Sequence, residues 1–335
     1  MRATLLAALF LACTVAVAPA GAFVSQPGSI TLPVWSPDGT RIAWMDAPMA
    51  NVPSPLSWQG WVAAADGSHP RLTIHGASLA EGVWQLDWLP HDRLAFFSNF
   101  SIYTARLGTR PTLLASNITD EFSTDRTGRH FAYEQSPCGG QCSQPSQIVV
   151  INPATKTRSI LGDAATYYSD PTLSPSGSQV AFASPAGLLA AHTDGSHLRV
   201  LATRASCPQW SPDSRTIAYI GERGSLRVVP AVGGPSKLLL RGPVPCHFGP
   251  LGLAWSPNGT MIAATFVAHE ALVLINVTTG RTRQLPGFSG VTGVAWSPDS
   301  TKLLVAARPK PAACSSLWAV DSNGAHRRLI VRCGS

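Results

Sequence analysis

Three aspartates occupy the same place in a repeated sequence pattern. WSPDGTRIAW, WSPDSRTIAY and WSPDSTKLLV place Asp38, Asp213 and Asp299 directly after Trp-Ser-Pro. A carboxylate can act as a general acid or base, as a nucleophile or as a metal ligand. A catalytic residue is needed once per site, however, whereas this one recurs along the chain. We therefore interpret the pattern as a turn, in which proline presets φ, aspartate bonds to its own backbone and glycine accepts positive φ.

A different set of residues, lying just before copies of this pattern, is a candidate ligand site. These residues are Trp84, Asp87, Asp120, Glu121 and Asp170. The four carboxylates would receive a cation or a basic segment of a partner, and solvated loop charge is the alternative interpretation. We predict that they surround the mouth of a channel, as the arrangement of elements described below implies.

Catalytic and metal motifs are missing from the sequence. It contains neither a G-x-S-x-G nucleophile elbow nor an H-E-x-x-H zinc motif. The Cys138–Cys142 pair lacks a second Cys/His pair at zinc spacing. His69, His197 and His326 recur near turns, which indicates surface positions, and His247 has no evident histidine partner. We predict no catalytic residue, no bound metal and no cofactor.

The elements that position these residues form seven repeats. The pattern starts near residues 35, 88, 124, 173, 210, 255 and 296, about 44 residues apart, a period typical of propellers and solenoids. Each unit holds four short β-rich segments separated by Gly, Asp or Asn turns, which predicts a four-stranded antiparallel sheet. Seven such sheets around an axis make an all-β, seven-bladed β-propeller. A right-handed parallel solenoid is the alternative, although its repeats are usually shorter and lack hairpin turns.

The pattern W-S-P-D-G-x-x-I-A-(W/Y), followed by a D-G-S turn, resembles the TolB-type, WD-like β-propeller repeat. Five of the seven units match it well, and the units starting at Trp88 and Thr124 depart from it. The resemblance covers essentially all of the chain after its first residues. It implies an exported binding scaffold without catalysis. The alternative is a propeller-fold hydrolase or lyase, acting on a lactone or a uronic-acid polysaccharide at the channel mouth.

The N-terminal segment has the composition of a signal peptide. Residues 1–22 contain an early arginine, an apolar run and small residues at the predicted cleavage point. We expect residues 23–335 to form the propeller domain, secreted or held in the cell envelope. Lipoprotein anchoring through Cys13 is disfavoured because the residues before it fit such a site poorly. The rest of the chain has no apolar run long enough for a membrane-spanning helix.

Six cysteines follow this segment, and an even number in an exported chain indicates disulfides. They are Cys138, Cys142, Cys207, Cys246, Cys314 and Cys333. Six cysteines allow 15 pairings, of which the simplest joins neighbours along the chain: 138 with 142, 207 with 246 and 314 with 333. All six are expected on one face, the face of the variable loops, and this is the candidate functional surface.

The formal charge of +7 raises the question of an anionic partner. Arg71, Arg199, Arg283 and Arg328 all fall at the start of the predicted fourth strand of a unit. That strand is an outer edge, where charged side chains discourage edge-to-edge aggregation. We therefore predict positive charge spread around the rim and no nucleic-acid binding. The expected partner of this monomer is a protein or an envelope polymer.

Overall fold

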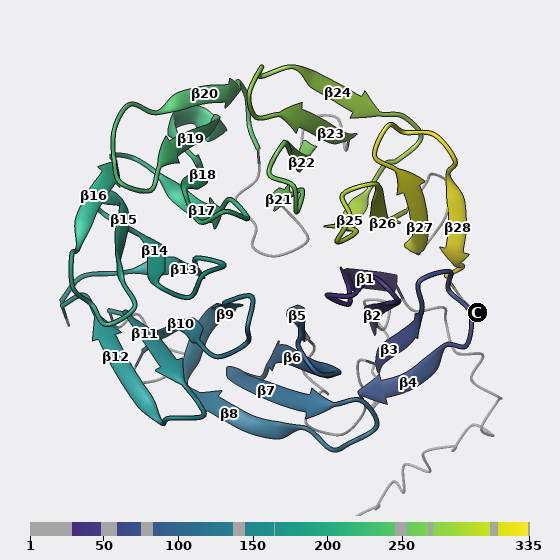
Figure 1. Cartoon of the computed structure of the whole chain (residues 1–335), viewed down its shortest axis with the longest axis horizontal. Coiled ribbons are helices and arrows are strands. Elements are labelled where there is room, and N and C mark those ends of the chain that lie inside the picture. The colour runs from purple at the N-terminus through teal and green to yellow at the C-terminus, as the bar shows by residue number, and fades with distance from the viewer. Residues whose placement is uncertain are drawn as a thin grey trace, which may run out of the picture.

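The computed structural model describes residues 29–47, 59–74, 83–136, 145–163, 165–244, 253–266, 271–308 and 314–333. In these ranges 28 strands form seven four-stranded antiparallel sheets, which stand as blades around a central axis (Figure 1). The helical part of the described ranges is one 3₁₀ turn, η3 (Glu222–Gly224). The predicted fold, a seven-bladed all-β propeller, is confirmed.

Each blade uses four consecutive strands of the chain. Blade 1 contains β1 (Ser29–Trp35), β2 (Arg41–Ala47), β3 (Gln59–Ala64) and β4 (Arg71–Ile74). Blade 2 contains β5 (Gln85–Leu89), β6 (Arg93–Ser98), β7 (Ser101–Arg106) and β8 (Thr112–Ser116). Blade 3 contains β9 (Ile118–Thr124), β10 (Phe131–Gln135), β11 (Gln147–Asn152) and β12 (Thr157–Leu161). Blade 4 contains β13 (Ser169–Leu173), β14 (Gln179–Ser184), β15 (Gly187–His192) and β16 (Arg199–Ala202).

The remaining three blades repeat this arrangement. Blade 5 contains β17 (Ser206–Trp210), β18 (Thr216–Ile220), β19 (Leu226–Pro230) and β20 (Lys237–Leu240). Blade 6 contains β21 (Leu253–Trp255), β22 (Met261–Phe266), β23 (Ala271–Asn276) and β24 (Thr282–Leu285). Blade 7 contains β25 (Val291–Trp296), β26 (Lys302–Ala307), β27 (Ser316–Asp321) and β28 (Arg328–Val331).

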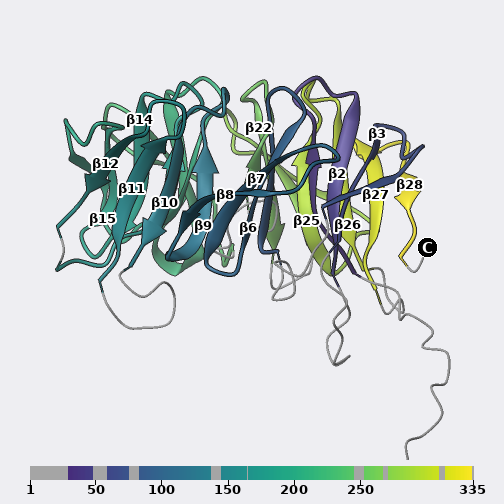
Figure 2. The ribbon, with the colours of Figure 1, turned by 90° about the horizontal axis from the view of Figure 1, so that it is seen from below.

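The first strand of every blade lies nearest the axis and the fourth lies at the rim (Figure 1). The strands run between the two faces of the disc (Figure 2). The repeated pattern ends the inner strand: β1 ends at Trp35, β17 at Trp210 and β25 at Trp296. In the two divergent units, β5 ends one residue after Trp88 and β9 ends at Thr124. We call the face where the inner strands end the turn face, and the opposite face the connector face.

Apolar side chains fill the wedges between blades. Seven clusters of buried residues are found in the described ranges, and each one joins two neighbouring sheets. Phe96, Phe131 and Phe182 are fully buried members of three of them. Burial of a phenylalanine side chain contributes about 1.5–3 kcal/mol, so the ring of blades is held mainly by these interfaces.

The Ser-Pro-Asp turn is closed by its own side chains. Ser36 Oγ accepts the N–H of Arg41 at 2.9 Å and donates to Asp38 Oδ1 at 2.6 Å. Asp38 Oδ1 also accepts the N–H of Thr40 at 3.0 Å, and Gly39 has a φ of 71°. The Ser36 hydroxyl, followed by the Thr40 N–H, lowers the pKa of Asp38 to about 2. The predicted structural role of the repeated aspartate is confirmed by these local bonds.

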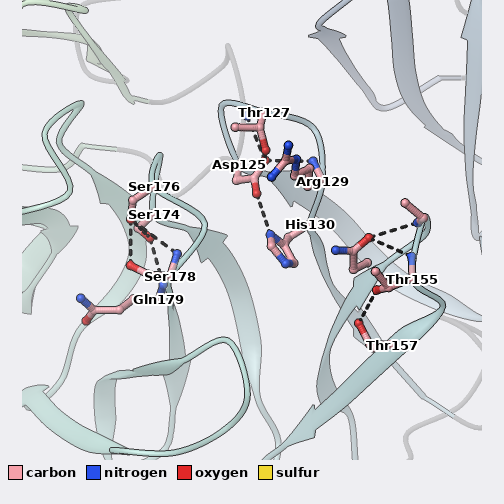
Figure 3. Close-up of polar contacts among 12 residues, drawn as sticks. Asp125, Thr127, Arg129, His130, Thr155, Thr157, Ser174, Ser176, Ser178 and Gln179 are labelled. Carbon is pink, nitrogen blue, oxygen red and sulfur yellow. Dashed lines mark hydrogen bonds and ion pairs between the residues drawn. The ribbon is translucent and has the colours of Figure 1, made fainter.

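The divergent turn of blade 3 uses another residue for the same purpose (Figure 3). Asp125 stands where five of the other units have serine, and its Oδ1 accepts the N–H groups of Thr127 at 2.9 Å and Arg129 at 3.0 Å. Its Oδ2 lies 2.7 Å from His130 Nδ1. Burial of Asp125 raises its pKa, but these hydrogen bonds outweigh burial and the net shift is downward. The turn therefore survives the loss of both tryptophan and proline.

The repeated tryptophan also joins neighbouring blades, because its indole N–H donates to the inner strand of the preceding blade. The bonds run from Trp210 Nε1 to Thr172 O at 2.9 Å, from Trp255 Nε1 to Gln209 O at 3.2 Å and from Trp296 Nε1 to Ala254 O at 2.9 Å. Trp35 Nε1, at the junction of blades 7 and 1, is buried without such a partner. The junction that closes the ring thus differs from these three junctions.

Basic residues near the start of the fourth strand donate hydrogen bonds to the next blade. The acceptors are backbone carbonyls in the turn between the third and fourth strands of that blade. The bonds run from Arg199 Nε to Ala231 O at 3.2 Å, from Lys237 Nζ to Val277 O at 3.0 Å and from Arg283 Nη1 to Asn323 O at 2.7 Å. The sequence analysis placed Arg199 and Arg283 correctly on the rim strand, but it did not predict that they join blades.

The ring closes where blade 7 meets blade 1. The hydroxyl of Thr292 donates to Ile30 O at 3.2 Å, and the N–H of Ile30 donates to Ser315 O at 3.3 Å. The two inner strands approach so closely that a Cβ on Gly293 would lie 2.5 Å from Pro33 Cδ. Glycine is therefore required at this position.

One predicted disulfide is confirmed: Cys314 is bonded to Cys333 and ties the start of β27 to the end of β28. Cys207 is also disulfide-bonded, with a partner outside the described residues. Cys138, Cys142 and Cys246 lie outside the described residues, so the other two pairings stay predictions. In the part of the chain that the structure describes, no helix is long and apolar enough to span a membrane.

Candidate functional site

A pocket of about 290 Å³ lies along the axis, between the inner strands of blades 2 to 5. The polar residues among its described lining are Gln85, Asp87, Glu121, Ser123, Thr124, Asp170, Thr172 and Gln209. Pro175, in the turn that follows β13, also lines it, so the pocket extends to the turn face. Three of the five predicted site residues therefore share one pocket, deeper in the channel than its connector-side mouth.

The alternation of strand side chains explains which residues reach the pocket. In the inner strands of blades 2 to 4, the lining positions are the third and the first residue before the residue at which the repeated pattern starts. Blade 2 has Gln85 and Asp87 there, blade 3 has Glu121 and Ser123, and blade 4 has Asp170 and Thr172. The same positions hold Leu32 and Val34 in blade 1, and Gly293 and Ala295 in blade 7. Blades 2 to 4 thus place acidic and polar side chains on the axial pocket, whereas the equivalent positions of blades 1 and 7 hold apolar or small residues.

Asp87 is half-buried in β5 and accepts a hydrogen bond from Gln85 Nε2 at 2.9 Å. Burial raises the pKa of Asp87 to about 6, and the bond from Gln85 only partly offsets this. The carboxylate is therefore ionised at neutral pH but takes up a proton under mildly acidic conditions. A raised pKa inside a pocket is a feature of many functional sites.

Gln85 holds this acid in place by joining two blades. Its side chain is 5% exposed. The Nε2 group donates to Phe122 O at 2.7 Å, and Oε1 accepts the N–H of Phe122 at 2.8 Å. The two bonds fix β5 against β9, so Asp87 and Glu121 are carried by one rigid pair of strands. The sequence analysis missed Gln85, although its place two residues before Asp87 is a signal for it.

Asp170 both lines the pocket and accepts a hydrogen bond from the next blade. The register of β13 shifts between Ser169 and Thr172, and Asp170 has a φ of 62°. Such a bulge re-aims a side chain. Asp170 Oδ2 accepts the N–H of Cys207 in blade 5 at 3.0 Å, so part of its role is to join blades 4 and 5.

Neither of the two remaining predicted site residues is among the described side chains that line the pocket. Trp84 is 59% exposed and directly precedes β5, at the connector end of the channel. Asp120 lies in β9, but its side chain is outside the described part of the structure. Tyr167, which the sequence analysis missed, is 53% exposed and lies just before β13. Trp84 and Tyr167 therefore present two aromatic rings at the connector end.

The three histidines predicted at the surface lie there: His69 and His197 are exposed, and the side chain of His326 is 86% exposed. His247 lies outside these ranges. Within the described part of the chain, no group of three or more His, Cys, Asp or Glu side chains could hold a metal ion.

No protein-family model matches the sequence, and no curated protein matches it. Solved structures with a similar fold do exist. An oligogalacturonate lyase from Vibrio parahaemolyticus is 10% identical with a TM-score of 0.64, over 88% of this chain and 90% of that one. A puromycin-hydrolyzing peptidase of Mycobacterium tuberculosis is 14% identical with a TM-score of 0.70, over 92% of this chain but 54% of that one.

TolB from Acinetobacter baumannii is also among the similar structures, at 14% identity and a TM-score of 0.52, over 90% of this chain and 62% of that one. The chain is thus a seven-bladed β-propeller whose resemblance to the TolB type is confirmed at the level of the fold. At these identities the likeness concerns the fold alone, because one propeller fold carries both binding scaffolds and enzymes.

Proposed function

We propose that this protein is an exported binding scaffold whose acidic axial pocket receives a cationic segment of a partner protein. The observation that carries the proposal is the convergence of Asp87, Glu121 and Asp170, from three successive blades, on one pocket. No Lys, Arg or His is among the described residues that line it. An arginine or lysine side chain entering the pocket would therefore meet three acids and no competing cation.

The exposed aromatic rings support a protein as the partner. Trp84 and Tyr167 flank the connector end of the same channel. Tryptophan, tyrosine and arginine are the residue types that dominate binding energy in protein interfaces. A segment bearing a basic residue would place its cation in the pocket while its neighbours contact these rings.

Export is supported by two observations of different kinds. Residues 1–22 have the composition of a signal peptide. Cys314 and Cys333 are disulfide-bonded, and disulfides persist in secreted and periplasmic proteins but are rare in the cytosol. TolB from Acinetobacter baumannii has a similar propeller fold, which agrees with a scaffold role in the envelope.

A labelled oligoarginine peptide tests the proposal, with oligoglutamate as the negative control. We expect the parent protein to bind oligoarginine, and D87N/E121Q to bind it at least about tenfold more weakly, a loss of about 1.4 kcal/mol. The matched control is E222Q, which removes a carboxylate from an exposed ion pair in blade 5. Binding should also weaken between about pH 7.5 and about pH 5, because Asp87 is protonated in that window. Equal binding by the parent and D87N/E121Q contradicts the proposal.

An enzyme is the second candidate, and the raised pKa of Asp87 favours it. A carboxyl group that titrates near pH 6 suits general acid or base catalysis. One similar structure is an oligogalacturonate lyase in complex with manganese. Turnover of oligogalacturonate with Mn²⁺ that is lost in D87N and kept in E222Q would replace the scaffold proposal.

A further inference from the structure

Arg71, like Arg328 in blade 7, lacks the interblade bond that basic residues at this position form in three other blades. In blades 4, 5 and 6 the basic residue near the start of the rim strand donates to a carbonyl in the next blade. Arg71 occupies this position in blade 1, and Leu107 and Gly108 of blade 2 border the same groove. Yet the exposed guanidinium of Arg71 has no hydrogen bond or ion pair among the described residues. Its donors are available to a ligand.

The groove beside Arg71 is rich in cationic and imidazole side chains. It has a volume of about 600 Å³ and lies on the turn face between blades 1 and 2. Arg71, Arg106, His69 and His91 line it and are exposed. Its one acidic lining residue, Asp92, forms an ion pair with Arg41, which also packs over the ring of Trp88. The local acid is thus already paired, and Arg71 and Arg106 keep uncompensated charge.

The pairing of β6 with β7 gives a second reason to expect an anion beside Arg106. Arg93 and Arg106 are direct partners across β6 and β7. Directly opposed residues of an antiparallel pair project to the same face of the sheet, and like charges there are destabilising. Neither guanidinium has an ion-pair partner in the part of the chain that the structure describes. An anion next to Arg106 would relieve this repulsion.

We propose that this groove binds an oxyanion of the phosphate class, with Arg71 and Arg106 as its cationic donors and His69 and His91 as further donors. Guanidinium groups present paired N–H donors that match phosphate oxygens, and such charge-assisted bonds are about twice as strong as neutral ones. The four side chains come from the β3–β4 hairpin, the β5–β6 turn and the end of β7. The groove is separate from the axial pocket, so this proposal does not depend on the proposed function.

Calorimetric titration with inorganic phosphate and with glycerol 1-phosphate, at constant ionic strength, tests the site. We expect millimolar or tighter binding by the parent protein and at least about tenfold weaker binding by R71Q/R106Q, since this variant loses the two guanidinium groups that would form charge-assisted bonds to the phosphate oxygens. The matched control is R223Q, which removes an exposed arginine from η3 in blade 5. Both arginines of the groove are exposed, and R106Q also removes the repulsion with Arg93. Without phosphate, R71Q/R106Q should therefore unfold at a midpoint no lower than that of the parent protein, and R223Q at the parent's midpoint.

Flotation with vesicles distinguishes a soluble phosphate ester from a membrane-borne one. Retention on phosphatidylglycerol vesicles, but not on phosphatidylcholine vesicles, in the parent and in R223Q but not in R71Q/R106Q, supports the site and assigns the phosphate to a lipid surface. Binding of glycerol 1-phosphate without retention supports the site and assigns it to a soluble ester. Equal binding by R71Q/R106Q and the parent, or no binding of any of these probes, overturns the proposal.

Discussion

Replacing Asp87 by asparagine removes the charge of this side chain and keeps its shape, including an oxygen that can accept the bond from Gln85. Burial raises the pKa of Asp87 from 3.8 to about 6. Each unit of pKa corresponds to about 1.36 kcal/mol, so a shift of about two units corresponds to an upper bound of about 3 kcal/mol. Because Asp87 is half-buried, solvent screening reduces this, and we expect D87N to be about 1–3 kcal/mol more stable at neutral pH.

The pH dependence of this gain has a definite sign. The folded-state pKa of Asp87 lies above the unfolded-state value, so the folded protein binds more protons between about pH 4 and pH 6. The parent protein therefore loses stability as the pH rises through this window. The advantage of D87N should be complete above pH 6, decline as the pH falls and vanish below about pH 4.

Urea unfolding followed by tryptophan fluorescence, at several pH values, measures this difference directly. A gain of about 1–3 kcal/mol corresponds to a rise in Tm of about 2–6 °C for a chain of this size. E222Q should show no comparable gain, because Glu222 is exposed in an ion pair with Arg204. If D87N is less stable than the parent at neutral pH, or if its advantage does not change with pH, the assignment of Asp87 as a desolvated pocket acid is wrong. A more stable but non-binding D87N would identify Asp87 as a residue kept for function at a cost in stability.

Three further predictions concern the bonds that hold the ring. Replacing Cys333 by serine opens a loop of 19 residues and should cost about 3 kcal/mol, which urea unfolding of the variant and of the reduced parent would measure; equal stability of C333S and the parent contradicts it. W210F removes the N–H that bonds to blade 4 and should cost about 1–3 kcal/mol, whereas W35F removes an N–H that has no partner and should cost less. R199Q loses its bond to blade 5 and should lower the unfolding midpoint, whereas R71Q should leave it unchanged; the opposite order would contradict the interblade role of Arg199.

The blade count could be predicted from the sequence because the repeated turn is local chemistry. Ser36, Asp38 and Gly39 close it within a few residues, so its signal needs no knowledge of the rest of the fold. The turn of blade 3 was harder to assign, since it lacks tryptophan and proline. There Asp125 accepts the N–H of Arg129, whose equivalent in blade 1, the N–H of Thr40, is accepted by Asp38. The loss of one residue is therefore compensated within the same turn.

Contacts between blades could not be predicted in the same way. Arg199 and Ala231 lie in different repeats, and the sequence pattern of either repeat does not specify how closely the two approach. Gln85 was missed for the same reason, since its importance comes from its two bonds to Phe122. The bulge that gives Asp170 a positive φ recurs at Leu32 and at Cys207, but the three positions share no residue type that would reveal it in the sequence. The acids themselves were predicted, but the depth of the pocket was not.

Departures from the repeat therefore locate the sites better than the repeat itself. Asp87, Glu121 and Asp170 line the axial pocket in blades 2 to 4. The equivalent inner-strand positions hold Leu32 and Val34 in blade 1 and Gly293 and Ala295 in blade 7. In blades 7 and 1, where the ring closes, apolar or small residues fill these positions. The fold alone therefore does not require acids there. The same reasoning applies to the turn face, where an arginine position that joins blades elsewhere is left unbonded at Arg71. Asp170 also joins blades 4 and 5, but among the described residues Asp87 and Arg71 form no bond to another blade. This is the physical reason for assigning these two residues to binding.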